Sequence, residues 1–152
     1  MMYKRRVLPL LITVFLMVFI FLQSALPADL SQQESNAIVT LLTGLLPVAP
    51  KTLSFVIRKS AHFMEYLLLG MSLFVTVREY FPVEERIGAV RFGLLLPWGI
   101  GTLYALTDEI HQRFVPGRSC EAGDVLIDSC GVAAGVLVMV LIRRAGEKKR
   151  RP

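Results

Sequence analysis

Long apolar segments are the feature that most restricts the fold of this chain. Predominantly apolar stretches cover about residues 7–26, 59–77, 88–107 and 125–142. A helix needs about 20 mostly apolar residues to cross the hydrocarbon layer of a bilayer, and these stretches approach that length. The sequence therefore predicts an all-α integral membrane bundle of four transmembrane helices.

The composition excludes other classes of protein. Hydrophobic residues make up 54% of the 152 residues, and the mean hydropathy is +0.57. A soluble domain of this size has too little interior for so many apolar side chains, and disordered chains are poor in them. Two cysteines, Cys120 and Cys130, are too few for a disulfide scaffold, and whether they pair stays open. We expect one membrane domain over residues 1–152.

The first apolar stretch has two interpretations. The basic residues at positions 4–6 followed by an apolar stretch resemble a secretory signal peptide. A signal peptide, however, has a short apolar region and an A-x-A-like cleavage site, and residues 23–28 offer no good match. We therefore favour a retained membrane span over a cleaved leader.

The distribution of Lys and Arg predicts the orientation. Basic residues concentrate at positions 4–6, between 78 and 91, and in the tail 143–152. Because cytoplasmic loops carry an excess of Lys and Arg, both termini are expected to face the cytoplasm. Attraction of this basic tail to anionic lipid explains the net charge of +5 without any nucleic acid.

The first outer loop carries a helical pattern of its own. Ser31 and Glu34 have the spacing of a capping box, and apolar residues recur at helical spacing from Ile38 to Leu45, before Pro47. This pattern predicts a short amphipathic helix in the loop. It lies either on the outer leaflet or against the bundle.

Ionisable residues of three spans fall in one layer near the outer surface. The apolar part of the second span is too short to cross the bilayer, so its helix extends back through Glu65 and His62. The same count places Asp108 in the last turn of the third span and Asp128 about one turn into the fourth. These helices and the loop after the third span therefore predict a polar pocket in the outer leaflet, formed by His62, Glu65, Tyr66, Asp108, Glu109, His111, Gln112, Arg118, Asp124 and Asp128.

Helix periodicity predicts how some of these residues face. His62 and Glu65 are three positions apart and share one face, whereas Glu109 points about 100° away from the face of Asp108. Gly131 and Gly135 form a GxxxG pattern, and such small residues let helices approach closely in lipid. Asp128 lies on the same stripe, so it is expected to face a neighbouring helix.

A turn is expected between the third and fourth spans. In Pro116-Gly117, proline fixes one residue and glycine accepts a positive φ at the next, which can send Arg118 back over the helix ends. Its guanidinium then either recognises an anionic head group or neutralises Glu65, Asp108 or Asp128. We slightly favour the counter-ion role, because several carboxylates lie on this side.

The polar positions also carry a family resemblance. The segments 59–66 (KSAHFMEY), 108–112 (DEIHQ) and 114–118 (FVPGR), followed by Asp124 and Asp128, resemble the VanZ-like family of bacterial membrane proteins. The resemblance implies a multi-pass protein of the bacterial cytoplasmic membrane in a cell-envelope context, with a link to teicoplanin-type glycopeptide resistance. It implies no particular reaction.

Two functions from different classes fit the pocket. In the first, the protein is no enzyme, and the pocket binds a lipid head group or another amphipathic ligand. Its partners would be membrane lipids, and the ligand a lipid-linked cell-wall precursor or a lipoglycopeptide. In the second, the protein is a membrane enzyme that acts on a lipid-linked phosphate, with His62 or His111 as general base and Glu65 or Asp108 as acid or orienting group.

A metal site is a further hypothesis. Histidine nitrogens and carboxylate oxygens suit a zinc- or manganese-type ion, and the candidate ligands are His62, Glu65, Asp108 and His111. Their spacing matches no established zinc signature. The sequence leaves the cofactor, the oligomeric state and the identity of the ligand open.

Overall fold

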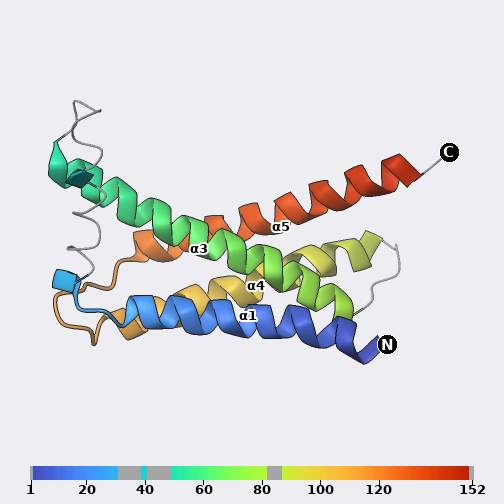
Figure 1. Cartoon of the computed structure of the whole chain (residues 1–152), viewed down its shortest axis with the longest axis horizontal. Coiled ribbons are helices and arrows are strands. Elements are labelled where there is room, and N and C mark those ends of the chain that lie inside the picture. Colours follow the sequence, from blue (N-terminus) through green and yellow to red (C-terminus); the bar gives the residue numbers. More distant parts are fainter. Residues whose placement is uncertain (1, 31–38, 41–48, 82–86, 151–152) are drawn as a thin grey trace.

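The computed structural model describes residues 2–30, 39–40, 49–81 and 87–150, and this part of the chain forms four long helices. They are α1 (Met2–Ser24), α3 (Pro50–Tyr80), α4 (Ile87–Gln112) and α5 (Ala122–Arg150). The helices run along one another, with both termini at one end of the bundle (Figure 1). The described part of the chain has no strand, in agreement with the predicted all-α fold.

Three of the described helices are long and apolar enough to span a membrane. They are Arg6–Ser24, Pro50–Tyr80 and Ala122–Lys149. α4 covers the predicted third span, but it is not among these three, so the fourth span remains a prediction. Of the predicted amphipathic loop helix, only residues 39–40 are described, and the rest lies outside the described residues.

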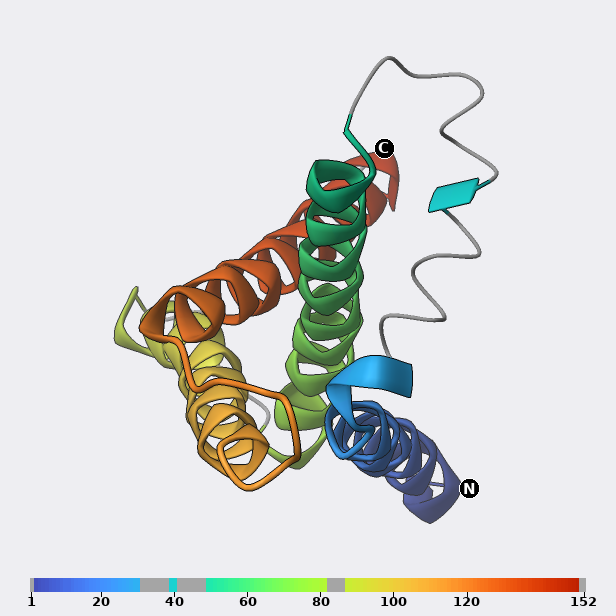
Figure 2. The same cartoon turned by 90° about the vertical axis from the view of Figure 1, so that its left-hand side faces the viewer.

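α3 is the central helix, because it packs against each of the other three. Figure 2, which views the bundle from the end opposite the termini, shows α3 beside both α1 and α5. The innermost side chains come from three helices and are almost completely buried: Tyr66, Leu69, Ala105 and Val132. The most extensive helix pairing is that of α3 with α5.

Small residues allow the close approach of α3 and α5. A Cβ added at Gly131 would lie 2.6 Å from the main-chain oxygen of Phe63, and one at Gly135 would lie 2.9 Å from the nitrogen of Met71. Real Cβ atoms essentially never come so close to a backbone atom. The GxxxG pattern therefore faces α3, as the helical stripe predicts.

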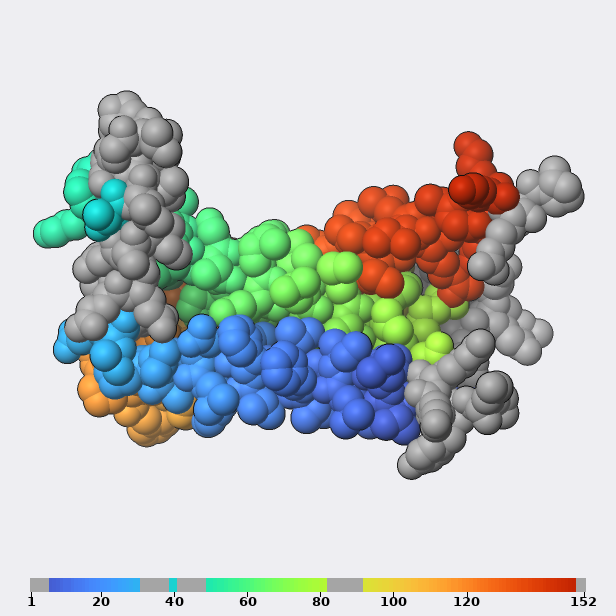
Figure 3. All heavy atoms as spheres, in the orientation of Figure 1, coloured from blue at the N-terminus to red at the C-terminus, as the bar shows by residue number. Residues whose placement is uncertain are grey.

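Polar contacts join α1 to the bundle along its length. The hydroxyl of Thr13 lies 2.7 Å from that of Ser72 and 2.8 Å from that of Thr76, and the Tyr104 hydroxyl donates to the main-chain oxygen of Met17 over 2.5 Å. Figure 3 shows α1 lying along α3 over much of the bundle. The outward face of α1 carries exposed residues such as Leu11 and Phe15, as expected of a helix in contact with lipid.

Candidate functional site

The predicted polar residues gather at one end of the bundle, opposite the termini. This end is formed by the first half of α3, the end of α4, the start of α5, the end of α1 and the loop 113–121. Helix direction explains the convergence, because α3 and α5 begin at this end whereas α1 and α4 finish there. The structure therefore places side chains that are far apart in sequence in one layer.

Asp108 is the centre of a buried network. Its side chain is 2% exposed, and its Oδ2 accepts a hydrogen bond from the Ser24 hydroxyl over 2.7 Å and one from Gln112 Nε2 over 3.3 Å. Its Oδ1 is buried and has no hydrogen-bond partner within the described part of the chain. The network joins α1 to α4 through a buried carboxyl group.

Asp128 is the most isolated of the buried carboxyl groups. It is 1% exposed, and neither of its oxygens has a hydrogen-bond partner among the described residues. The nearest basic atom is Nδ1 of His62, 3.9 Å from Oδ1, which is too far for a direct hydrogen bond. Tyr66 is fully buried as well, and its hydroxyl has no partner in the described ranges.

Glu109 and Glu65 face different surroundings. Glu109 is buried, and its Oε1 accepts a hydrogen bond from the main-chain nitrogen of Glu121 over 2.6 Å, which fixes the start of α5 to the end of α4. This position agrees with the prediction that Glu109 points away from Asp108. Glu65 is partly buried on α3, one turn further into the bundle than His62.

Arg118 lies beside the end of α1 and binds main-chain oxygens there. Gly117 has a φ of +76°, and the turn brings Arg118 back over the end of α1. Its Nε donates to the main-chain oxygen of Leu26 over 3.0 Å, and its two terminal nitrogens donate to the oxygen of Gln23 and to Gln112 Oε1, each over 3.2 Å.

The described residues show no direct ion pair of Arg118 with a carboxylate, so its role as a counter-ion stays a prediction. Arg118 donates instead to the carbonyl of Gln23 in the last turn of α1 and to that of Leu26 just after the helix. Burial lowers the pKa of Arg118, and the charge of Asp108 opposes that shift. An arginine stays protonated in a protein, so the group keeps its charge.

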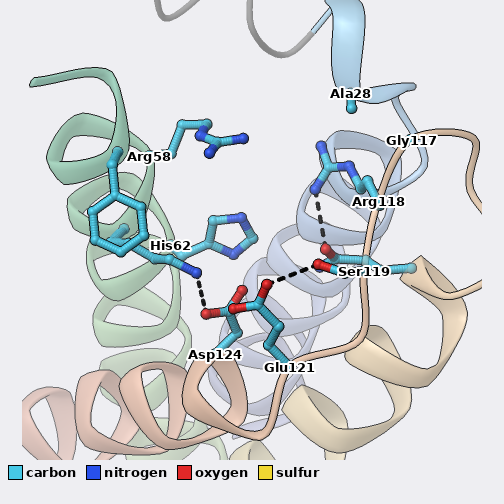
Figure 4. Close-up of a pocket in the computed structure, with 11 residues that line it drawn as sticks. Ala28, Arg58, His62, Gly117, Arg118, Ser119, Glu121 and Asp124 are labelled. Carbon is cyan, nitrogen blue, oxygen red and sulfur yellow. Dashed lines mark hydrogen bonds and ion pairs between the residues drawn. The ribbon is translucent and has the colours of Figure 1, made fainter. Parts of the chain in front are cut away.

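A pocket with a volume of about 300 Å³ opens beside Arg118 (Figure 4). Its walls come from α3, from the loop 113–121 and from the start of α5. Lys59 forms an ion pair with Asp124 inside it. The lining residues are Ala28, Phe55, Arg58, Lys59, His62, Gln112, Gly117, Arg118, Ser119, Glu121 and Asp124.

An apolar hollow of about 380 Å³ adjoins this pocket on the surface of α3. It is lined by Phe55, Val56, Lys59, Ser60, Phe63 and Met64, and it shares Phe55 and Lys59 with the polar pocket. A polar pocket and an apolar groove therefore meet at one turn of α3.

The pocket contains some predicted residues and omits others. His62, Gln112, Arg118 and Asp124 line it, whereas Glu65, Tyr66, Asp108, Glu109 and Asp128 are not among its lining residues. His111 packs its ring on Phe21, with 4.5 Å between ring centroids. No three His, Cys, Asp or Glu side chains in the described ranges are grouped so that they could hold a metal ion.

The sequence interpretation missed Arg58, Ser24 and Glu121 as site residues. Arg58 lies one helical turn before His62, so the i, i+4 rule would have placed both on one face. No sequence signal distinguishes Ser24 from any other polar residue at a helix end. Cys120 and Cys130 are both free and exposed, so the structure shows no disulfide between them.

Comparison with known proteins identifies the family. A family model described as VanZ/LLP1 matches residues 9–143, which is most of the chain. The chain belongs to this family, and the resemblance seen in its polar motifs is confirmed. No curated protein and no solved structure matches it.

Proposed function

We propose that this VanZ-like membrane protein binds an amphipathic ligand whose head group carries a phosphate. The observation that carries the proposal is that the polar pocket and the apolar hollow are adjacent, because Phe55 and Lys59 line both. A head group fits the first cavity while an acyl or isoprenoid chain extends along the second. Ligand pockets combine apolar walls with a few polar groups that fix orientation in the same way.

The basic residues of the pocket support a phosphate. Arg58 and Arg118 both line it, and a guanidinium offers a planar set of N–H donors that matches phosphate oxygens. Arg58 Nε is buried and has no hydrogen-bond partner within the described part of the chain. Lys59 is already paired with Asp124, so Arg58 is the cation best placed to receive a ligand.

The proposal includes a topology. We propose that α4 is the fourth span and that the pocket faces the outer leaflet, with both termini cytoplasmic. The Lys and Arg at the end of α3 and in the last turns of α5 support this orientation, because both helices end opposite the pocket. The ligand is then a membrane lipid, a lipid-linked cell-wall precursor or a lipoglycopeptide, which is consistent with a role in glycopeptide resistance.

Replacement of Arg58 tests the head-group site. The purified protein in detergent is titrated with fluorescent phosphatidylglycerol, and binding is followed by polarisation. We expect Arg58→Gln to weaken binding roughly tenfold or more, since a hydrogen bond to a charged group contributes about 1.5–3 kcal/mol. Arg113→Gln is the matched control, because Arg113 is exposed at the same end and does not line the pocket. Equal binding by both variants would contradict the proposal.

A second candidate function is acid–base catalysis on a lipid-linked phosphate. His62 favours it, because the ring lines the pocket and its Nδ1 lies 3.9 Å from the buried Asp128. A carboxylate behind a histidine can orient the ring as a general base. Turnover of a lipid-linked phosphate by the purified protein, lost in His62→Gln and retained in Arg113→Gln, would establish this function. Phosphate release equal to that of a protein-free blank would remove it.

A further inference from the structure

We infer that the preferred head group carries a primary ammonium as well as a phosphate. The inference rests on the proposed function and assigns the chemical class of its ligand. Figure 4 shows the guanidinium groups of Arg58 and Arg118 on one side of the pocket and the carboxylates of Glu121 and Asp124 on the other, with His62 between them. A ligand with separated charges of both signs matches this arrangement better than a simple anion.

Glu121 is the residue that accepts the ammonium. Its carboxylate accepts a hydrogen bond from the Ser119 hydroxyl over 2.8 Å, and its main-chain nitrogen donates to Glu109. The described residues place no cation within ion-pair distance of Glu121, whereas Asp124 is paired with Lys59. The pocket therefore holds one carboxylate that is positioned by neutral and main-chain partners and whose charge has no partner.

The balance of charges in the pocket also favours a ligand that carries an ammonium. Arg58, Lys59 and Arg118 face Glu121 and Asp124, and the Lys59–Asp124 pair neutralises one charge of each sign. Two guanidinium groups and one carboxylate remain. If a phosphodiester binds between the two guanidinium groups, the next group of the ligand lies near Glu121. The Glu121 carboxylate attracts an ammonium at that place and repels a second anionic group.

A quaternary ammonium fits less well than a primary one. Quaternary groups are recognised by cages of several Trp, Tyr or Phe rings, and Phe55 is the one residue of these types that lines this pocket. A primary ammonium donates hydrogen bonds, which a carboxylate accepts. The preferred head group is therefore of the phosphoethanolamine type rather than the phosphocholine type.

Lipids with identical acyl chains test this inference. Purified full-length protein in detergent is titrated with fluorescent phosphatidylethanolamine, phosphatidylcholine and phosphatidylglycerol. We expect the first to bind roughly two- to fivefold more tightly than the other two, the range expected for a partly exposed ion pair. Glu121→Gln, which keeps the shape of the side chain, should abolish this preference and strengthen phosphatidylglycerol binding, because it removes a negative charge beside an anionic lipid. Asp29→Asn, an exposed acid at the same end that does not line the pocket, should keep the preference.

The outcomes separate the inference from the proposed function. Equal binding of the three lipids, unaffected by Glu121→Gln but weakened by Arg58→Gln, would overturn the ammonium site and leave the phosphate site standing. Binding of no lipid by the wild-type protein would overturn both. Soluble glycerophosphoethanolamine, which has no acyl chains, is added as a competitor. If it displaces the fluorescent lipid at a concentration equal to that of the lipid, the ammonium site is supported, but a contribution of the apolar hollow to binding is refuted.

Discussion

Replacing Gly131 with alanine should separate α3 from α5. The added Cβ would lie 2.6 Å from the main-chain oxygen of Phe63 and 3.2 Å from Cβ of Tyr66, whereas ordinary contacts begin at 3.4 Å. The nearest obstacle is backbone, which cannot rotate away as a flexible side chain can, so the helices must move by several tenths of an ångström. Overpacking of this kind costs about 1–3 kcal/mol.

This cost predicts a measurable loss of thermal stability. A change of 1 kcal/mol shifts the midpoint of a domain of this size by about 2–4 °C, so we expect Gly131→Ala to melt roughly 2–12 °C below the wild type in detergent. The assay heats the purified protein and measures the soluble monodisperse fraction by size-exclusion chromatography. The 3.9 Å spacing between His62 and Asp128 crosses the same helix pair, so ligand binding should weaken as well.

Gly146 provides the control on the same helix. A Cβ added there meets no atom within 4 Å, so Gly146→Ala should leave stability unchanged or raise it by about 0.5–1 kcal/mol, because alanine restricts the unfolded chain. If Gly131→Ala melts at the wild-type temperature while Gly146→Ala behaves as expected, α3 and α5 do not pack as closely as described.

Three other outcomes follow from the contacts of α1. Ser24→Ala should cost about 1–3 kcal/mol of stability, because the buried Asp108 loses its shortest hydrogen bond; thermal melting measures this. Arg118→Ala should lower thermal stability and lipid binding together, because the side chain holds the carbonyl groups of Gln23 and Leu26 and also lines the pocket. Intact-mass spectrometry of the membrane-extracted protein should show that α1 is retained, because its contacts with the other helices are specific.

These outcomes have separate controls. Ser119→Ala removes an exposed hydroxyl from the same end and should leave the melting temperature near that of the wild type. Arg113→Gln should do the same for the loss of a guanidinium. Melting of Ser24→Ala at the wild-type temperature would show that the buried network adds little stability, and a mass that lacks residues 1–28 would show that the first segment is a cleaved leader.

The helices and their common polar end could be predicted from the sequence. Apolar length locates each helix, and helical periodicity predicts that Gly131 faces a neighbour. Counting 1.5 Å per residue from each helix end places His62, Asp108 and Asp128 near one surface without knowledge of how the helices pack. The depth of a residue in the bilayer depends only on its distance along its own helix, so it can be predicted from the sequence without knowing how the helices pack.

The hydrogen-bond partners of the polar residues could not be predicted, because several of these partners are main-chain atoms. Arg118 binds the carbonyl groups of Gln23 and Leu26, and the carboxylate of Glu109 binds the amide of Glu121. Every residue has a carbonyl, so a sequence cannot show which of them a guanidinium will reach. The excess of carboxylates suggested an ion pair for Arg118, but the turn at Gly117 directs it to the end of α1 instead.

The loop after α4 connects the position of α1 with the shape of the pocket. Arg118 and Gly117 line the pocket. The same turn binds the end of α1 through the Arg118 guanidinium, and it binds the segment after α1 through the hydrogen bond from Ala28 N to Pro116 O over 3.2 Å. A phosphate that binds Arg118 therefore also acts on a group that closes the end of α1. Because linkage is reciprocal, a ligand that stabilises this turn must tighten the attachment of α1, and loosening α1 must weaken the ligand.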